Sequence, residues 1–147
     1  MKKRRYRGKR FETHKLEKSL KGNNDLLNLT MPELITDIHA EYLDAGSDMI
    51  ETNTFNCTKP SMEDYDCTDI VYELNHTAAK LAKAACARVT KKDMTTPRFT
   101  CGAIGPTSRT LSVSPSVEDP SFRACSFDEL VSAYKEQVSK EANEIIN

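Results

Sequence analysis

The order of helices and strands that the sequence predicts is the feature that most constrains its fold. Apolar residues at helical spacing predict helices over residues 30–45 and 67–90 and from residue 126 onwards, and short apolar runs predict strands at 49–52 and 98–104. Helices and strands that alternate in this way favour parallel strands joined by right-handed helical crossovers. The chain is therefore expected to adopt an α/β fold.

Local patterns mark where these helices begin and end. Thr30–Glu33 and Ser126–Glu129 both match the capping box, in which a Ser or Thr and a Glu three residues later bond to each other's backbone N–H groups. Pro32 falls in the first turn, where a missing N–H costs nothing, and Gly46 is a natural stop. We therefore predict that helices begin at both boxes.

Two long connections follow the predicted strands. Residues 53–66 and 105–125 each lead from a strand to a helix, whereas such loops usually have about 2–6 residues. Long loops in compact domains usually carry function, and in (β/α)8 barrels the working face carries the strand-to-helix loops. The chemistry is therefore expected near Thr52–Pro60 and Gly105–Cys125.

Four residues at the ends of the predicted strands are candidates for substrate binding. Asn53 and Thr54 follow the first strand, where amide and hydroxyl groups can orient a polar ligand, although Asx and Ser/Thr turns would use the same residues structurally. Gly105 and Thr107 belong to a turn whose backbone N–H groups could approach a substrate, although a plain strand terminator would look the same. Both interpretations remain open at each position.

Length and composition indicate one globular domain. The chain has 147 residues, of which 38% are hydrophobic and 29% charged, which is unlike disordered or fibrous sequences. No apolar run of about 18 residues is present to span a membrane, and the N-terminus lacks the apolar stretch of a secretory signal. We therefore expect a cytoplasmic protein without a membrane partner.

The cysteines and histidines do not form a recognisable metal motif. The five cysteines have long gaps and no Cys-x-x-Cys, so we expect reduced thiols, with Cys86 and Cys101 as small core residues. His39 and His76 fall on predicted helices without a partner at metal-binding spacing, and the isolated His14 has no particular interpretation.

Positive charge is concentrated at the start of the chain. Seven of the 21 Lys and Arg residues lie in the first ten positions, which leaves 14 against 22 acidic residues in the remainder. Nucleic-acid binding requires basic residues spread over a surface, so we expect no nucleic-acid partner.

The two predicted strands also fall short of a closed barrel, which typically takes about 250 residues, so the chain looks incomplete.

Four segments resemble the N-terminal homocysteine-binding module of cobalamin-dependent methionine synthase, and the resemblance continues from Ser126 to about Gln137. The long Gly-Pro-Thr to Ser-Pro-Ser loop and the Lys-Gly-Asn-Asn-Asp run favour this family over betaine- and S-methylmethionine-dependent homocysteine methyltransferases. The four matching segments are Tyr6–Phe11, Leu20–Leu27, Ile50–Phe55 and Gly102–Pro115.

The resemblance implies a (β/α)8 TIM barrel of which residues 1–147 supply an incomplete domain of about two to three β/α units. In that family three cysteines hold zinc, and the homocysteine thiolate attacks the methyl group of methylcobalamin in another domain, giving methionine. A thiol with a pKa near 8.5 is mostly protonated at neutral pH, and metal coordination deprotonates it. Homocysteine, zinc, methylcobalamin and the cobalamin-carrying domain are thus the implied substrate, cofactors and partner of the full-length protein.

The chain also departs from the family pattern. The family's first strand should precede Tyr6, residues 1–5 are an unmatched basic start, and residues 138–147 drift from the pattern. The zinc cysteines, one alone and two adjacent, are expected beyond residue 147, so no residue here is assigned to catalysis or to metal binding. Cys57 and Cys125 lie in the expected active-face loops without a family role.

The resemblance also suggests roles for residues outside the four candidates. Glu51 would face either the barrel mouth or a helix N-terminus, and Arg109 is either a contact to the substrate carboxylate or cobalamin domain or a solvated loop cation. Lys21–Asp25 is interpreted as a capped turn that packs the chain entry against the barrel.

These observations lead to a homocysteine S-methyltransferase fragment that is inactive and binds no cofactor alone. Its uncovered strand edges and helix faces predict poor solubility. The alternative is a non-catalytic truncated relative or an interaction module without methyltransferase activity.

Overall fold

The computed structural model describes residues 20–146, and the chain alternates helices and strands as the sequence predicts. The predictions made for the basic start, for Tyr6–Phe11 and for His14 lie outside the described residues. The elements are α2 (Leu27–Thr30), α3 (Pro32–Asp44), β1 (Met49–Glu51), α4 (Lys59–Met62), the 3-10 turns η1 (Glu63–Tyr65) and η2 (Thr68–Ile70), α5 (Val71–Thr90), β2 (Phe99–Cys101) and α6 (Phe127–Ile146).

The two strands form a parallel sheet, which confirms the expected strand direction. Ile50 lies opposite Thr100 in the register, and α5 is the helical crossover between the two strands. Within residues 20–146 the sheet has two strands and does not close into a barrel. The structure is therefore a partial α/β fold.

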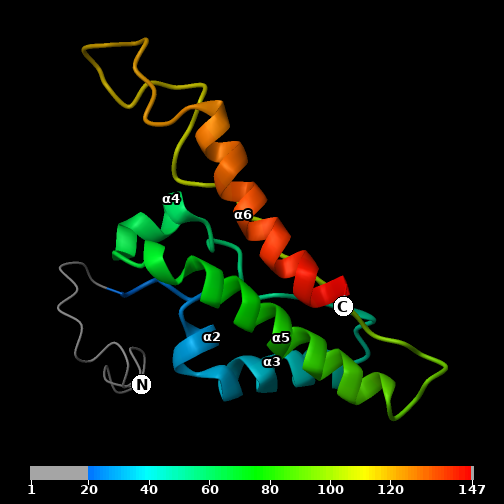
Figure 1. Ribbon diagram of the computed structural model, residues 1–147. Coiled ribbons are helices and arrows are strands. Elements are labelled where there is room, and N and C mark those ends of the chain that lie inside the picture. The colour runs from blue at the N-terminus through cyan, green and yellow to red at the C-terminus, as the bar shows by residue number, and fades with distance from the viewer. Residues whose placement is uncertain (1–19, 147) are drawn as a thin grey trace.

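Helices cover one face of this sheet. Ile50 points into a cluster formed with Leu43 of α3 and with small residues of α5, whereas Met49 and Phe99 on the opposite face are exposed. Figure 1 shows α5 lying between α3 and α6, and α5 contacts both. The described chain thus has a helical layer on one side of β1 and β2 and an uncovered sheet face on the other.

Alanine allows α5 to pack closely against its neighbours. Ala78 and Ala85 are buried on this helix, as the helical spacing of its apolar residues predicts, and Ala79 and Ala82 are buried beside them. A side chain of one methyl group fills a narrow gap between a helix and the elements beside it, so α5 lies close to the sheet.

The start of α3 differs from the prediction. The helix begins at Pro32, but Met31 is its N-cap residue and no side chain caps it. The Thr30 hydroxyl instead donates to the Leu26 carbonyl, 3.2 Å away, because Thr30 ends the preceding helix α2. The capping box at Thr30 was therefore wrong. Gly46 ends the helix as expected, with a φ of +104° that glycine adopts at little cost.

The predicted loop over residues 53–66 also differs, because it contains α4 and η1. Met62 and Cys57 of this segment pack with Leu26 and Leu74 in a second hydrophobic cluster. The predicted helix start at Cys67 is replaced by η2, and α5 begins at Val71. We call residues 52–70 the first strand-to-helix segment and residues 102–126 the second.

The capping box at Ser126 is confirmed. The backbone N–H of Ser126 donates to Glu129 Oε2 at 2.7 Å, and the Glu129 N–H donates to Ser126 Oγ at 3.2 Å. Helix α6 follows and runs through residues 138–146.

Among the helices of residues 20–146, none combines the length and the apolar character that a membrane span requires.

Candidate functional site

Hydroxyl and backbone groups join the carboxyl ends of β1 and β2. The Thr54 hydroxyl donates to the Ala103 carbonyl at 2.9 Å, and the Ala103 N–H donates to Thr52 Oγ1 at 2.9 Å. The two threonine hydroxyls lie 2.7 Å apart. Because Thr54 has given its only hydroxyl proton to Ala103, Thr52 must donate to Thr54, and the three bonds form a closed ring. We call Thr52, Thr54 and Ala103 the threonine ring.

Thr54 is fully buried, and both functions of its hydroxyl are used in the threonine ring. Within the protein this hydroxyl therefore joins the ends of β1 and β2.

Gly105 lies where a side chain would not fit. Its N–H donates to the Phe55 carbonyl at 3.1 Å, and a Cβ atom built on Gly105 would lie 2.3 Å from that same oxygen. The Tyr134 hydroxyl of α6 donates to the Gly105 carbonyl at 2.9 Å. Glycine is thus required for the close approach of the two strand-to-helix segments.

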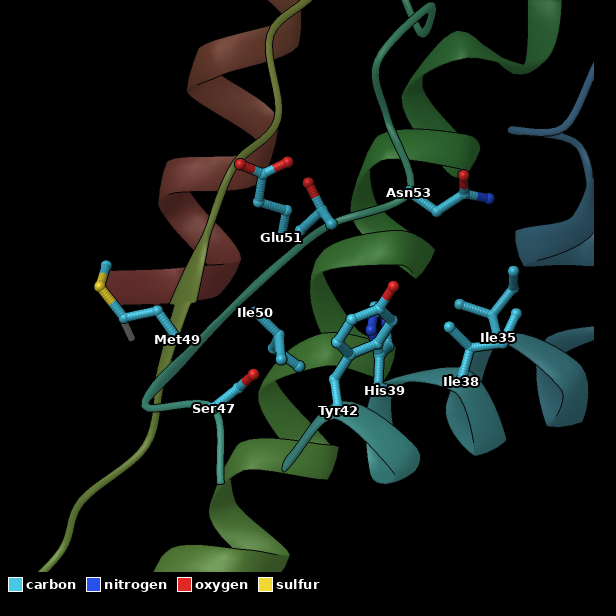
Figure 2. Close-up of a pocket in the computed structure, with 10 residues that line it drawn as sticks. Ile35, Ile38, His39, Tyr42, Ser47, Met49, Ile50, Glu51 and Asn53 are labelled. Carbon is cyan, nitrogen blue, oxygen red and sulfur yellow. The ribbon is translucent and has the colours of Figure 1, made fainter. Parts of the chain in front are cut away.

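Asn53 points away from the threonine ring and toward the segment before α3. Its Nδ2 donates to the Asn24 carbonyl at 3.0 Å and to Asn28 Oδ1 at 3.3 Å, while Asn28 Nδ2 donates to the Asn53 carbonyl at 2.7 Å. Figure 2 shows the side chains of Glu51 and Asn53 leaving the chain in opposite directions. Asn53 therefore fixes the strand end to residues 24–28.

Thr107 and Arg109 form a local turn in the second segment. The Thr107 hydroxyl donates to the Arg109 carbonyl at 3.0 Å and accepts from the Arg109 N–H at 3.3 Å. The Arg109 side chain forms an ion pair with Glu63 of the first segment and donates to the Ala124 carbonyl. Of the four candidates, Thr54 and Gly105 thus lie where the two strand-to-helix segments meet. Asn53 instead bonds to Asn24 and Asn28, and Thr107 bonds to Arg109.

Gln137 is a site residue that the sequence analysis missed. Its Nε2 donates to the Thr54 carbonyl at 2.8 Å and to the Ala103 carbonyl at 3.2 Å, although it lies on α6 and is fully buried. Gln137 follows Ala133 by four positions, so the two residues lie on the same side of α6, and both are buried. A polar residue at helical spacing from a small apolar one was the signal available in the sequence. Gln137 joins both strand ends to α6.

The Lys21–Asp25 turn contacts the first segment through Asn23 and Asp25. Asn23 Oδ1 accepts the Leu26 N–H at 3.1 Å, and Asp25 Oδ1 accepts the Asn56 N–H at 3.2 Å. Burial raises the pKa of the Asp25 carboxyl above 3.8, although hydrogen bonds from Asn56 and Cys57 oppose that shift. This buried acid is part of the scaffold that holds the strand end.

The described residues do not fit a zinc site. Within residues 20–139 no three His, Cys, Asp or Glu side chains lie together in a metal-binding group. Burial, with smaller effects of Asp69 and Asp66, raises the pKa of the Cys67 thiol to about 11, and burial also raises the pKa of Cys86. A raised thiol pKa disfavours the thiolate that zinc requires. Cys57 and Cys125 are buried and belong to no such group.

Comparisons with known proteins agree with this geometry. The model of one family, described as homocysteine S-methyltransferase, matches residues 6–146. Two solved structures are similar, both of the homocysteine methyltransferase MmuM from Escherichia coli. The metallated form is 18% identical with a TM-score of 0.63, covering 80% of this chain and 41% of MmuM. The oxidized form is 18% identical with a TM-score of 0.62, covering 80% and 40%.

The chain therefore spans about two fifths of the length of these solved structures. At 18% identity the likeness shows the fold, which is similar to part of the MmuM fold. The family model extends through residues 138–146, the segment that the sequence analysis describes as divergent.

Proposed function

The chain belongs to the homocysteine S-methyltransferase family, and from this premise we propose that it forms the second and third β/α units of a homocysteine-binding barrel. The parent activity is the transfer of a methyl group to homocysteine, giving methionine. The resemblance of Ile50–Phe55 and Gly102–Pro115 to methionine synthase supports methylcobalamin, carried on another domain, as the methyl donor. Zinc is the proposed metal of the full-length protein.

The threonine ring is the observation that carries this proposal. It links the carboxyl ends of β1 and β2 through bonds of 2.7–2.9 Å, with Gln137 bound to the same carbonyls. Strand ends held in this way can present backbone groups in a fixed geometry, which is what precise substrate binding needs. The carboxyl edge is also where the long strand-to-helix loops of such barrels work.

The four candidate residues then have different proposed roles. Thr107 belongs to the turn that we propose meets homocysteine, and Gly105, whose N–H and carbonyl are bonded to Phe55 and Tyr134, shapes that turn by allowing the close approach of Phe55. Thr54 and Asn53 are positioning residues, because their polar groups are already used within the protein. Arg109 orders the second segment through Glu63 and Ala124.

Activation of the substrate thiol is not proposed for the described residues. Within the described residues no group of His, Cys, Asp or Glu side chains fits zinc. When bound in the full-length protein, zinc would lower the thiol pKa and so supply the thiolate. The chain alone is therefore expected to be inactive and to bind neither zinc nor methylcobalamin.

The test combines a binding and an activity measurement on the purified 147-residue chain. Titration calorimetry with reduced L-homocysteine should show weak saturable binding, with L-serine as a control for non-specific amino-acid binding. Gly105→Ala should abolish this binding, because the added Cβ would displace Phe55 and the turn. Zinc-dependent transfer of a methyl group from methylcobalamin to homocysteine by this chain would contradict the proposed inactivity. Equal binding of both amino acids would contradict the substrate assignment.

The proposed location is the cytoplasm, supported by five free cysteines with no disulfide between them in the described structure. The alternative function, a non-catalytic interaction module, is favoured by the outer edge of β1, which pairs with no strand within residues 20–146. Selective homocysteine binding would favour the first function, and binding of a polypeptide without homocysteine would favour the second.

A further inference from the structure

Gly105 is held by a different element on each side of its backbone. Its N–H donates to the Phe55 carbonyl of the first segment at 3.1 Å, and its carbonyl accepts from the Tyr134 hydroxyl of α6 at 2.9 Å. The direction of the N–H depends on φ and that of the carbonyl on ψ, and these are the two soft dihedral angles of a residue. The first segment and α6 together therefore fix the direction in which the chain leaves Gly105.

Pro106 carries this direction on to Thr107. Among the described residues no peptide bond is cis, so Gly105 and Pro106 are joined by a trans bond. The proline ring holds the φ of Pro106 at about −65°. Between the Gly105 carbonyl and the Thr107 nitrogen, only the ψ of Pro106 is left to rotate. A change in the orientation of the Gly105 carbonyl therefore moves Thr107.

Thr107 presents a backbone donor at the end of this linkage. Its hydroxyl is occupied, because it donates to the Arg109 carbonyl at 3.0 Å and accepts from the Arg109 N–H at 3.3 Å. Its own N–H donates to no group within residues 20–146. A hydrogen bond weakens steeply when the angle at the donor falls below about 120°. The orientation of Thr107 therefore determines how well its N–H can bond to a ligand.

Helix α6 gives Tyr134 a fixed base. Gln137 lies three positions later on the same side of the helix, and its Nε2 donates to the carbonyls at both strand ends, at 2.8 and 3.2 Å. Glu136 forms an ion pair with Lys59 of α4 at 2.9 Å. The Tyr134 hydroxyl thus projects from a turn of helix that is already bonded to both strand-to-helix segments.

We propose that Tyr134 is a positioning residue for homocysteine, because its hydroxyl holds the Gly105 carbonyl and thereby orients Thr107. This proposal rests on the proposed function, in which the Thr107 turn meets homocysteine. Tyr134 acts through Gly105 and Pro106 rather than by touching the substrate. The affinity for homocysteine then depends on a single hydroxyl group of α6, a helix that follows the proposed site in the sequence.

Calorimetric titration of the full 147-residue chain with reduced L-homocysteine measures the effect of this hydroxyl. Tyr134→Phe removes one oxygen and keeps the ring, and it should weaken binding about three- to tenfold, the range expected for one hydrogen bond. Tyr42→Phe is the matched control, because Tyr42 lies on α3 and is 62% exposed, and it should leave binding unchanged. Equal weakening by the two variants would contradict the proposal.

A double-mutant cycle separates positioning from a general loss of stability. Pro106→Gly frees the dihedral angle through which the orientation is passed, and should itself weaken binding about two- to fivefold. When Pro106→Gly is present, Tyr134→Phe should weaken binding by less than about twofold further, because the linkage is already broken. If Tyr134 only stabilised the fold, the two effects would multiply, and that result would overturn the proposal.

Amide-resolved NMR tests the same linkage without a ligand. The Thr107 N–H resonance and the Gly105 carbonyl ¹³C resonance should both shift in Tyr134→Phe and stay in place in Tyr42→Phe. A Thr107 resonance that does not move, with homocysteine binding intact, would overturn the role of Tyr134 alone. Failure of the wild-type chain to bind homocysteine would instead overturn the proposed function, and the Thr107 resonance would still show whether Tyr134 orients the turn.

Discussion

The two strand-to-helix segments occupy the same place in the topology but are held in different ways. In the first, residues 52–70, Cys57, Thr58 and Met62 are completely or almost completely buried. In the second, residues 102–126, Val113, Val117 and Phe122 are exposed. The first segment is part of the hydrophobic core, and the second lies mainly outside it.

The hydrogen bonds show the same contrast. The first segment bonds to distant parts of the chain, including Asp25, Asn75 and Gln137. Much of the second is held by short-range bonds, such as those of the Asp119 carboxylate to Ser121 and of the Ser114 hydroxyl to the Asp119 carbonyl. Topological position alone therefore does not determine how rigid a loop is; burial and long-range bonds do.

The largest expected difference concerns core packing. Met62→Ala should lower the free energy of unfolding by about 2–5 kcal/mol, because it empties a fully buried position in the core. Val117→Ala in the second segment should change it by less than about 0.5 kcal/mol, since Val117 is 97% exposed. Urea unfolding followed by circular dichroism measures both. Similar losses for the two variants would remove the distinction between the segments.

The threonine ring gives the next largest effect. Thr54→Val should cost about 1–3 kcal/mol, because the Thr52 donor loses its partner and the Ala103 carbonyl loses a bond in a buried setting. Thr54→Ser keeps the hydroxyl and should retain most of the stability. Thr110→Val, in the exposed part of the second segment, is the matched control. Equal unfolding midpoints for Thr54→Val and Thr110→Val would show that the ring contributes little.

Two acids are expected to give opposite pH dependences. Burial raises the pKa of Asp25 above 3.8, so the folded chain holds this proton more tightly and stability is lost as pH rises from 3.8 through the raised pKa. Hydrogen bonds from Ser121 lower the pKa of Asp119, so its contribution is present above pH 3.8 and lost as pH falls below it.

Substitution of each acid by asparagine separates the two effects. As pH increases above 3.8, the stability of Asp25→Asn relative to wild type should increase, because wild type loses the Asp25 contribution. As pH decreases below 3.8, the stability of Asp119→Asn relative to wild type should increase, because wild type loses the Asp119 contribution. Unfolding curves at a series of pH values test this. A slope of the same sign for both variants would contradict the difference in their surroundings.

The smallest expected effect concerns the ion pair between the segments. Arg109→Ala should change stability by about 1 kcal/mol or less, because Arg109 and Glu63 are partly exposed. Limited proteolysis should nevertheless cut the second segment faster, since the bond to Ala124 is also lost. Faster cutting within residues 52–70 instead would mean that Arg109 supports the buried segment.

Local patterns predicted the elements well because their signals lie within a few residues. The apolar spacing of α5 and the box at Ser126 depend on neighbours three or four positions apart. The capping box predicted at Thr30 was wrong because the Thr30 hydroxyl donates to the Leu26 carbonyl, four residues earlier. The short helices after Thr58 escaped prediction because their burial depends on Leu26 and Leu74, which belong to other elements.

The site was less predictable, because its bonds join distant positions. Thr54 was identified from its place at a strand end, but the partner of its hydroxyl, the Ala103 carbonyl, lies 49 residues away in the sequence. Gln137 lies 83 residues from Thr54, and nothing in its own neighbourhood indicates the pairing. Sequence spacing could locate the carboxyl edge but not divide its residues between ligand and scaffold.

The most direct test of the account is an amide-resolved NMR titration of the ¹⁵N-labelled chain with reduced L-homocysteine. We expect chemical-shift changes centred on Gly105 and Thr107, with smaller ones at Asn53 and Thr54 and none along α5. Changes spread over the exposed loop residues 110–122, or an absence of change at saturating ligand, would contradict the claim that the joined strand ends form part of a homocysteine site.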